Sequence, residues 1–167
     1  MRVVVMGAVL LTALLVATVV LPAFAIAGVR PDLVTLTVVG FALADGPDTG
    51  LRYGFSAGLA TDLLTGNGLV GVSALVLLLV GYVVGLSRPY LTVAPTVGMI
   101  VMGGLASALA VAGTGTLSLL FDLSQTTGVS VLRTALGTGL YSAVLAPFVC
   151  HPLRALSEHF SVSPTGV

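Results

Sequence analysis

Apolar runs long enough to cross a membrane recur along this chain, and they restrict its fold more than any motif does. Residues 3–21 and residues 91–112 contain no charged side chain, and a helix of about 20 residues spans the hydrocarbon of a bilayer. Because 57% of the residues are hydrophobic and only 7% are charged, the composition excludes an ordinary water-soluble domain. The sequence therefore predicts an all-α membrane protein.

Charged and turn-forming residues divide the chain into a bundle of about six predicted transmembrane helices, which form a single domain over residues 1–167. The predicted spans are residues 3–27, 31–44, 49–65, 69–86, 91–112 and 129–149. The second and third spans are short for a hydrocarbon thickness of about 30 Å. Short neighbouring spans indicate a functional region, a bundle in which protein covers the helix ends, or simple tilt mismatch.

The segments outside the spans allow further predictions. Ala23-Phe24-Ala25 is similar to a signal-peptide cleavage site, but the preceding apolar run is longer than that of a signal peptide, so we expect an uncleaved first helix. Residues 113–128 are predicted to be the longest loop, with the apolar segment 117–123 at the membrane interface. Residues 152–160 are predicted to form a separate interfacial helix.

The arginines predict the orientation of the six spans. An even number of spans places both termini on one side, and arginine is enriched on the cytoplasmic side of membrane proteins. With cytoplasmic termini, four arginines lie inside and two lie outside. Those inside are Arg2, Arg52, Arg88 and Arg154, and those outside are Arg30 and Arg133. We therefore expect a multi-pass protein of the cytoplasmic membrane.

The rest of the chain is organised around residues 54–71. Gly54 and Gly58 are four residues apart, so a neighbouring helix can approach this face closely. Gly66, Gly68 and Gly71 follow at a predicted helix end and reversal. We expect these glycines to have a structural or partner-binding role.

Asp62 lies within about one turn of that helix end, where the helix dipole disfavours a negative charge. The carboxylate therefore needs compensation, which could come from N–H groups of the turn, from the Thr65 hydroxyl, or from Arg30 or Arg133. One interpretation is that Asp62 only shapes the turn. The other is that the turn which it fixes is used for assembly with a partner.

A first charged cluster, Arg30-Pro31-Asp32, precedes the second span. Pro31 suits the first turn of a helix, and Asp32 suits the positive end of the helix dipole. Asp48 is a candidate N-cap for the third span.

Residues for catalysis or metal binding are scarce. The six acidic residues form no evident catalytic pair, and Cys150 is the single cysteine. The two histidines, His151 and His159, have no cysteine or acidic residue at a spacing that would make a metal site. Motifs for phosphate binding, for a nucleophilic serine and for a zinc protease are absent, and the formal net charge is zero. We predict no enzyme activity, no cofactor, no metal and no nucleic-acid partner.

Two segments resemble the rod shape-determining protein MreD family. They are Arg30-Pro31-Asp32-Leu33 and the run from Gly54 through Asp62 to Gly66, which continues with Gly68-Leu69-Val70-Gly71. The resemblance implies a subunit of the cell-wall elongation machinery that works with MreC, with the RodA–penicillin-binding-protein synthase pair, and indirectly with the MreB filament. It also implies a fold like the six-helix substrate-binding subunit of energy-coupling-factor vitamin transporters. That likeness supplies the alternative function, capture of a small molecule.

Overall fold

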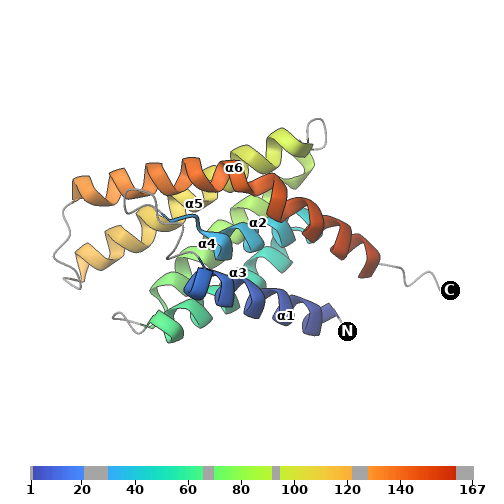
Figure 1. The fold of residues 1–167 in the computed structure, drawn as a ribbon, viewed down its shortest axis with the longest axis horizontal. Coiled ribbons are helices and arrows are strands. Elements are labelled where there is room, and N and C mark those ends of the chain that lie inside the picture. The colour runs from blue at the N-terminus through green and yellow to red at the C-terminus, as the bar shows by residue number, and fades with distance from the viewer. Residues whose placement is uncertain (1, 21–29, 66–69, 92–94, 122–127, 161–167) are drawn as a thin grey trace.

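The computed structural model of the chain consists of helices packed around one central helix (Figure 1). It describes residues 2–20, 30–65, 70–91, 95–121 and 128–160. In these residues the α-helices are α1 (Arg2–Leu15), α2 (Leu33–Asp45), α3 (Pro47–Thr65), α4 (Val72–Leu86), α5 (Pro95–Leu120) and α6 (Gly128–Phe160). A π-helical segment, η1 (Val16–Val20), continues α1, and a 3₁₀-helix, η3 (Arg88–Leu91), follows α4. Each of these regular elements is helical, as the sequence predicted.

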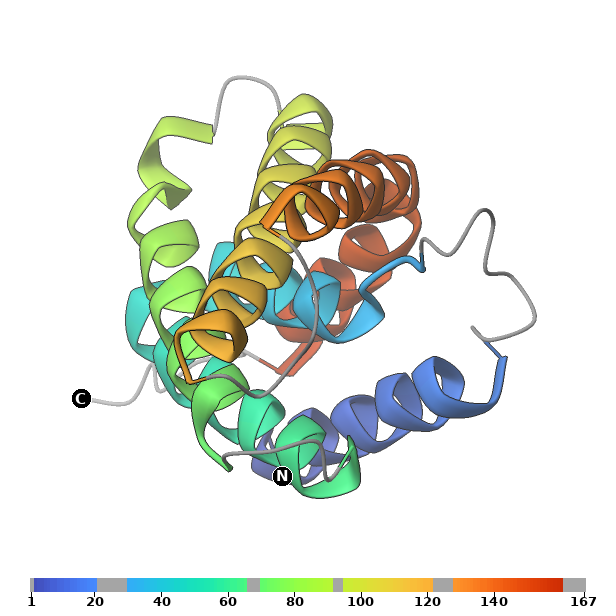
Figure 2. The same ribbon diagram turned by 90° about the vertical axis from the view of Figure 1, so that its left-hand side faces the viewer.

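Two antiparallel hairpins, α3–α4 and α5–α6, enclose α2, and α1 lies at the periphery (Figure 2). Every residue of α2 from Val34 to Leu43 is buried. A helix that is apolar on all sides belongs in an interior. Protein rather than lipid therefore covers this short helix.

Helices α1 and α2 run in opposite directions along the bundle, and the start of α1 lies at the same end as the end of α6 (Figure 1). Two helical segments are long and apolar enough to cross a membrane by themselves, Thr96–Leu120 and Gly128–Leu153. Shorter apolar helices cover Met6–Val19, Leu33–Asp45 and Val72–Leu86. Residues 21–27 of the first predicted span, which include the cleavage-like tripeptide, lie outside the described residues.

The fifth span was predicted as residues 91–112, but α5 extends to Leu120, so the predicted loop is wrong over residues 113–120. The glycines and threonines of residues 113–116 fit inside the helix. The hydroxyl of Thr114 donates to the carbonyl of Ala110 at 2.8 Å, and the hydroxyl of Thr116 donates to that of Ala112 at 2.7 Å. Satisfying a hydroxyl within its own helix removes the reason for a loop.

The separate interfacial helix over residues 152–160 was predicted wrongly, because α6 is one helix of 33 residues that continues from the predicted sixth span through Pro147 and Pro152. Membrane helices tolerate internal proline when neighbouring groups satisfy the freed carbonyls. Helix α6 bends along its length (Figure 1), as expected of a helix with internal proline.

The caps of two helices differ from the sequence prediction. Pro31 is not in the first turn of α2, because Asp32 is the N-cap and the helix begins at Leu33. Asp48 is not the N-cap of α3, because that helix begins at Pro47 and Asp48 lies in its first turn. Proline is favoured at the first helical position, and Gly46, with φ of 98°, ends α2 directly before it.

Candidate functional site

The glycine face of α3 packs directly on the backbone of α4. A Cβ atom at Gly58 would lie 2.5 Å from the Cα atom of Ala74, and one at Gly54 would lie 2.8 Å from the carbonyl carbon of Leu77. Such distances leave no room for a side chain. The close approach that the spacing predicted is therefore present, and the neighbour is the next helix of the same chain.

Glycines of α4 and one further glycine of α3 extend this contact along the hairpin. A Cβ atom at Gly50 would lie 2.9 Å from the carbonyl carbon of Gly81. At Gly85, a Cβ atom would lie 2.6 Å from the backbone nitrogen of Pro47. The sequence analysis missed Gly50, Gly81 and Gly85, although Gly81 and Gly85 repeat the four-residue spacing of Gly54 and Gly58.

Asp62, near the end of α3, accepts hydrogen bonds from the beginning of α4. One carboxylate oxygen, Oδ2, lies 2.7 Å from the backbone nitrogen of Gly71, 3.1 Å from that of Ser73 and 3.4 Å from that of Ala74. The first N–H groups of a helix have no partner within the helix and lie at its positive end. The amino end of α4 thus compensates the negative charge that the carboxyl end of α3 disfavours.

The other groups considered for compensating Asp62 do not do so. The hydroxyl of Thr65 donates instead to the carbonyl of Thr61 at 2.6 Å. Arg30 and Arg133 are exposed, and neither forms an ion pair within the described part of the chain. The geometry agrees with the interpretation in which backbone N–H groups hold the carboxylate.

Gly71 is the N-cap residue of α4 and has φ of 112°. This left-handed conformation favours glycine. A Cβ atom at this position would meet nothing within 4 Å, so the requirement is conformational rather than steric. Gly66 and Gly68 lie outside the described residues.

The second predicted acid, Asp32, caps α2 at a separate place. Its Oδ1 atom accepts from the backbone nitrogen of Thr35 at 3.0 Å, and its Oδ2 atom accepts from the Thr35 hydroxyl. Its own backbone N–H donates to the buried hydroxyl of Ser142 at 3.1 Å, which ties the start of α2 to α6. Pro31 is buried beside this cap, whereas Arg30 is exposed.

The link between Asp32 and Ser142 joins residues 110 positions apart. A serine inside an apolar helix gives no indication of its partner, so sequence analysis missed it. Asp32 was predicted to lie at the positive end of the helix dipole, and the structure places it there as the N-cap rather than inside the first turn.

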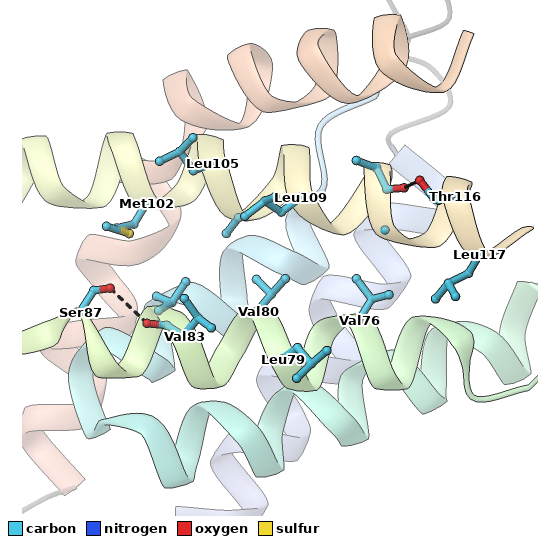
Figure 3. A pocket seen from close by; sticks show the side chains of 14 residues that line it. Val76, Leu79, Val80, Val83, Ser87, Met102, Leu105, Leu109, Thr116 and Leu117 are labelled. Atoms are coloured by element: carbon cyan, nitrogen blue, oxygen red, sulfur yellow. Dashed lines mark hydrogen bonds between the residues drawn. The ribbon is translucent and has the colours of Figure 1, made fainter. Parts of the chain in front are cut away.

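A groove of about 700 Å³ separates α4 from α5 (Figure 3). Its walls are apolar side chains such as Leu79, Val83 and Leu109. Ser87 and Thr116 also line the groove, but each hydroxyl donates to a carbonyl of its own helix. The groove thus presents an apolar surface with its hydroxyls satisfied.

The described residues contain no group of three or more metal-ligating side chains. Within the same residues Asp32 and Asp62 both act as helix caps, one at the start of α2 and one at the start of α4. The two acids that the sequence analysis singled out therefore serve as helix caps in the structure.

The family model described as rod shape-determining protein MreD matches residues 1–156. No curated protein and no solved structure matches the chain.

Proposed function

Because the chain belongs to the rod shape-determining protein MreD family, we propose that it is a non-enzymatic subunit of the bacterial cell-wall elongation complex. In this proposal it binds an MreC-like membrane protein and links it to the RodA–penicillin-binding-protein synthase pair, and through these partners to the MreB-like filament. The match over residues 1–156 carries the proposal.

The packing of the hairpins supports a scaffold role. Glycines at the α3–α4 contact bring two backbones together, and Asp62 bonds the end of one helix to the start of the next. Two helices that pack closely along their length, and whose connected ends are hydrogen-bonded to each other, form a rigid body. Rigidity suits a protein that holds partners in fixed relative positions.

The α4–α5 groove is the surface that we assign to the membrane helix of the MreC-like partner. Three leucines that line it, Leu79, Leu105 and Leu109, are 54–60% exposed, so they can pack against an apolar partner helix. Its hydroxyls are already bonded to their own helices. An apolar helix would therefore leave no polar group unsatisfied on this side of the contact.

Co-purification in mild detergent from the native host tests the proposal. The tagged protein should retain the MreC-like protein and the synthase pair. Leu109→Trp, which places a bulky ring on the groove wall, should reduce retention at least tenfold. The matched control is Leu140→Trp on α6, because Leu140 is similarly exposed, at 74% against 60% for Leu109, but lies outside the groove. Equal retention in both variants would remove the groove from the proposal.

We further propose that the protein crosses the cytoplasmic membrane several times with both termini in the cytoplasm. Reporter fusions after Arg88 and at the C-terminus should then report the cytoplasm, and a fusion after Asn67 or within residues 121–127 should report the outside. A cytoplasmic signal from the Asn67 fusion would overturn this topology.

The alternative of a substrate-capture subunit of a vitamin transporter receives no support from the comparisons. The likeness of the bundle to that six-helix subunit stays a prediction, since no solved structure matches. The same co-purification separates the two functions. A transporter subunit would co-purify with an ATPase pair and a coupling subunit, and that result would contradict the scaffold proposal.

A further inference from the structure

Helix α1 meets α3 along a cleft of about 580 Å³ that combines apolar and polar walls. From α1 come Met6, Gly7 and Leu10, and from α3 come Thr49, Arg52 and Ser56. The cleft is open on the α1 side, because a Cβ atom at Gly7 would meet nothing within 4 Å. A cleft with one apolar wall and one positively charged wall fits an amphipathic ligand.

Arg52 supplies the charge of this cleft. Its side chain is exposed and forms no ion pair within the described residues, although Asp48 lies four residues earlier in α3. The hydroxyl of Thr49, also in the cleft, donates to no partner in the same part of the chain. A guanidinium and a hydroxyl without partners are donors suited to phosphate oxygens.

The position of the cleft suits a lipid headgroup. Met6 lies in the second turn of α1 and Arg52 in the second turn of α3, and both helices begin at the same end of the bundle (Figure 1). An arginine near a helix end can place its charge at the level of the headgroups. Basic pockets between membrane helices on the cytoplasmic side bind anionic headgroups.

We propose that the α1–α3 cleft binds one anionic phospholipid, whose phosphate contacts Arg52 and Thr49 and whose acyl chain lies along Met6, Gly7 and Leu10. Charge complementarity selects this occupant over an apolar helix, because such a helix would leave the guanidinium desolvated and unpaired. The α4–α5 groove differs, because none of the described residues that line it is charged. The proposal is independent of the elongation complex, since it concerns the purified protein alone.

Native mass spectrometry of the purified full chain tests the proposal, with phosphatidylglycerol and phosphatidylcholine of identical acyl chains as probes. The unaltered protein should retain one phosphatidylglycerol, with a preference of about tenfold over phosphatidylcholine. Arg52→Gln should abolish the preference. The matched control Arg133→Gln removes another exposed arginine, on α6 and outside the cleft. This variant should keep the preference for phosphatidylglycerol.

A second variant tests the apolar wall. Gly7→Leu fills the cleft from the α1 side where the structure has open space, so the fold should persist while retention of phosphatidylglycerol falls. Equal retention of the two lipids by the unaltered protein, or loss of the preference in Arg133→Gln, would overturn the proposal. A dimer that Arg52→Gln converts to monomer would also overturn it, because the cleft would then be an interface between two copies of the chain.

Discussion

The two hairpins of the bundle are both packed through small residues, but they achieve contact in different ways. In α3–α4, glycines meet backbone: Gly54 faces Leu77, and Gly58 faces Ser73 and Ala74. In α5–α6, glycines meet mainly methyl groups: a Cβ atom at Gly103 would lie 2.6 Å from the Cβ atom of Ala146, and one at Gly104 would lie 2.9 Å from that of Ala143. The first hairpin therefore has less freedom to adjust.

The connected end of the α3–α4 hairpin is held by hydrogen bonds as well. Asp62 joins the end of α3 to the start of α4 through three backbone N–H groups. The comparison suggests that α3–α4 is the fixed part of the bundle and that α5–α6 tolerates change better.

The largest expected difference in stability is between two variants that each add one methyl group, one variant in each hairpin. Gly58→Ala pushes a side chain into the backbone of α4, which cannot rotate away, and we expect it to destabilise the protein by about 3 kcal/mol, at the upper end for overpacking. Gly104→Ala meets the methyl group of Ala143 at 2.9 Å and a carbonyl oxygen of Gly139 at 3.0 Å. We expect about 1 kcal/mol for that change.

Thermal unfolding of the two variants in the same detergent measures this difference, with the membrane level of each protein as a second readout. The comparison between the hairpins fails if Gly104→Ala lowers the midpoint temperature as much as Gly58→Ala does.

An intermediate effect is expected at the Asp62 cap. Asp62→Leu removes the acceptor of three N–H groups, and loss of a capping side chain costs about 1–2 kcal/mol. Asp62→Asn retains an oxygen acceptor, so we expect it to cost less than about 1 kcal/mol. This order follows from a carboxylate that is held by N–H groups rather than by a cation.

Unfolding of the Asp62 variants is measured beside Thr65→Ala, whose hydroxyl donates to Thr61 and not to Asp62. That control should leave stability nearly unchanged. If Asp62→Asn is as harmful as Asp62→Leu, a charge pair with an arginine is required and the capping account is wrong.

Local features of this chain could be predicted from sequence because the signals lie within a few residues of one another. The spacing of Gly54 and Gly58 predicted a close-packed face, and the conflict at Asp62 predicted that backbone groups or a cation would compensate the acid. Both follow from helix geometry and the helix dipole. The helical class followed from composition.

Features that depend on tertiary partners could not be predicted. Nothing near Ser142 in the sequence indicates that its hydroxyl would accept the N–H of Asp32. The extension of α5 to Leu120 was missed because Gly113 and Gly115 suggest a loop in isolation. In the structure, Cβ atoms there would lie 3.0 Å from Val76 and 2.5 Å from Val131, so these glycines serve helix packing.

An effect smaller than that of Gly58→Ala or Asp62→Leu is expected at Gly71, and it separates conformation from packing in the α3–α4 hairpin. Alanine there must adopt φ of 112°, which costs about 1 kcal/mol, but its methyl group meets nothing within 4 Å. Gly71→Ala should therefore lower the unfolding midpoint by about a third of the shift seen for Gly58→Ala, taking overpacking at about 3 kcal/mol. Gly7→Ala, also in open space but in an ordinary helical position, is the matched control and should not lower the midpoint, because alanine is favoured over glycine inside a helix by about 0.5–1 kcal/mol. A shift for Gly71→Ala as large as that for Gly58→Ala would mean that the turn, rather than backbone contact between the helices, fixes this hairpin.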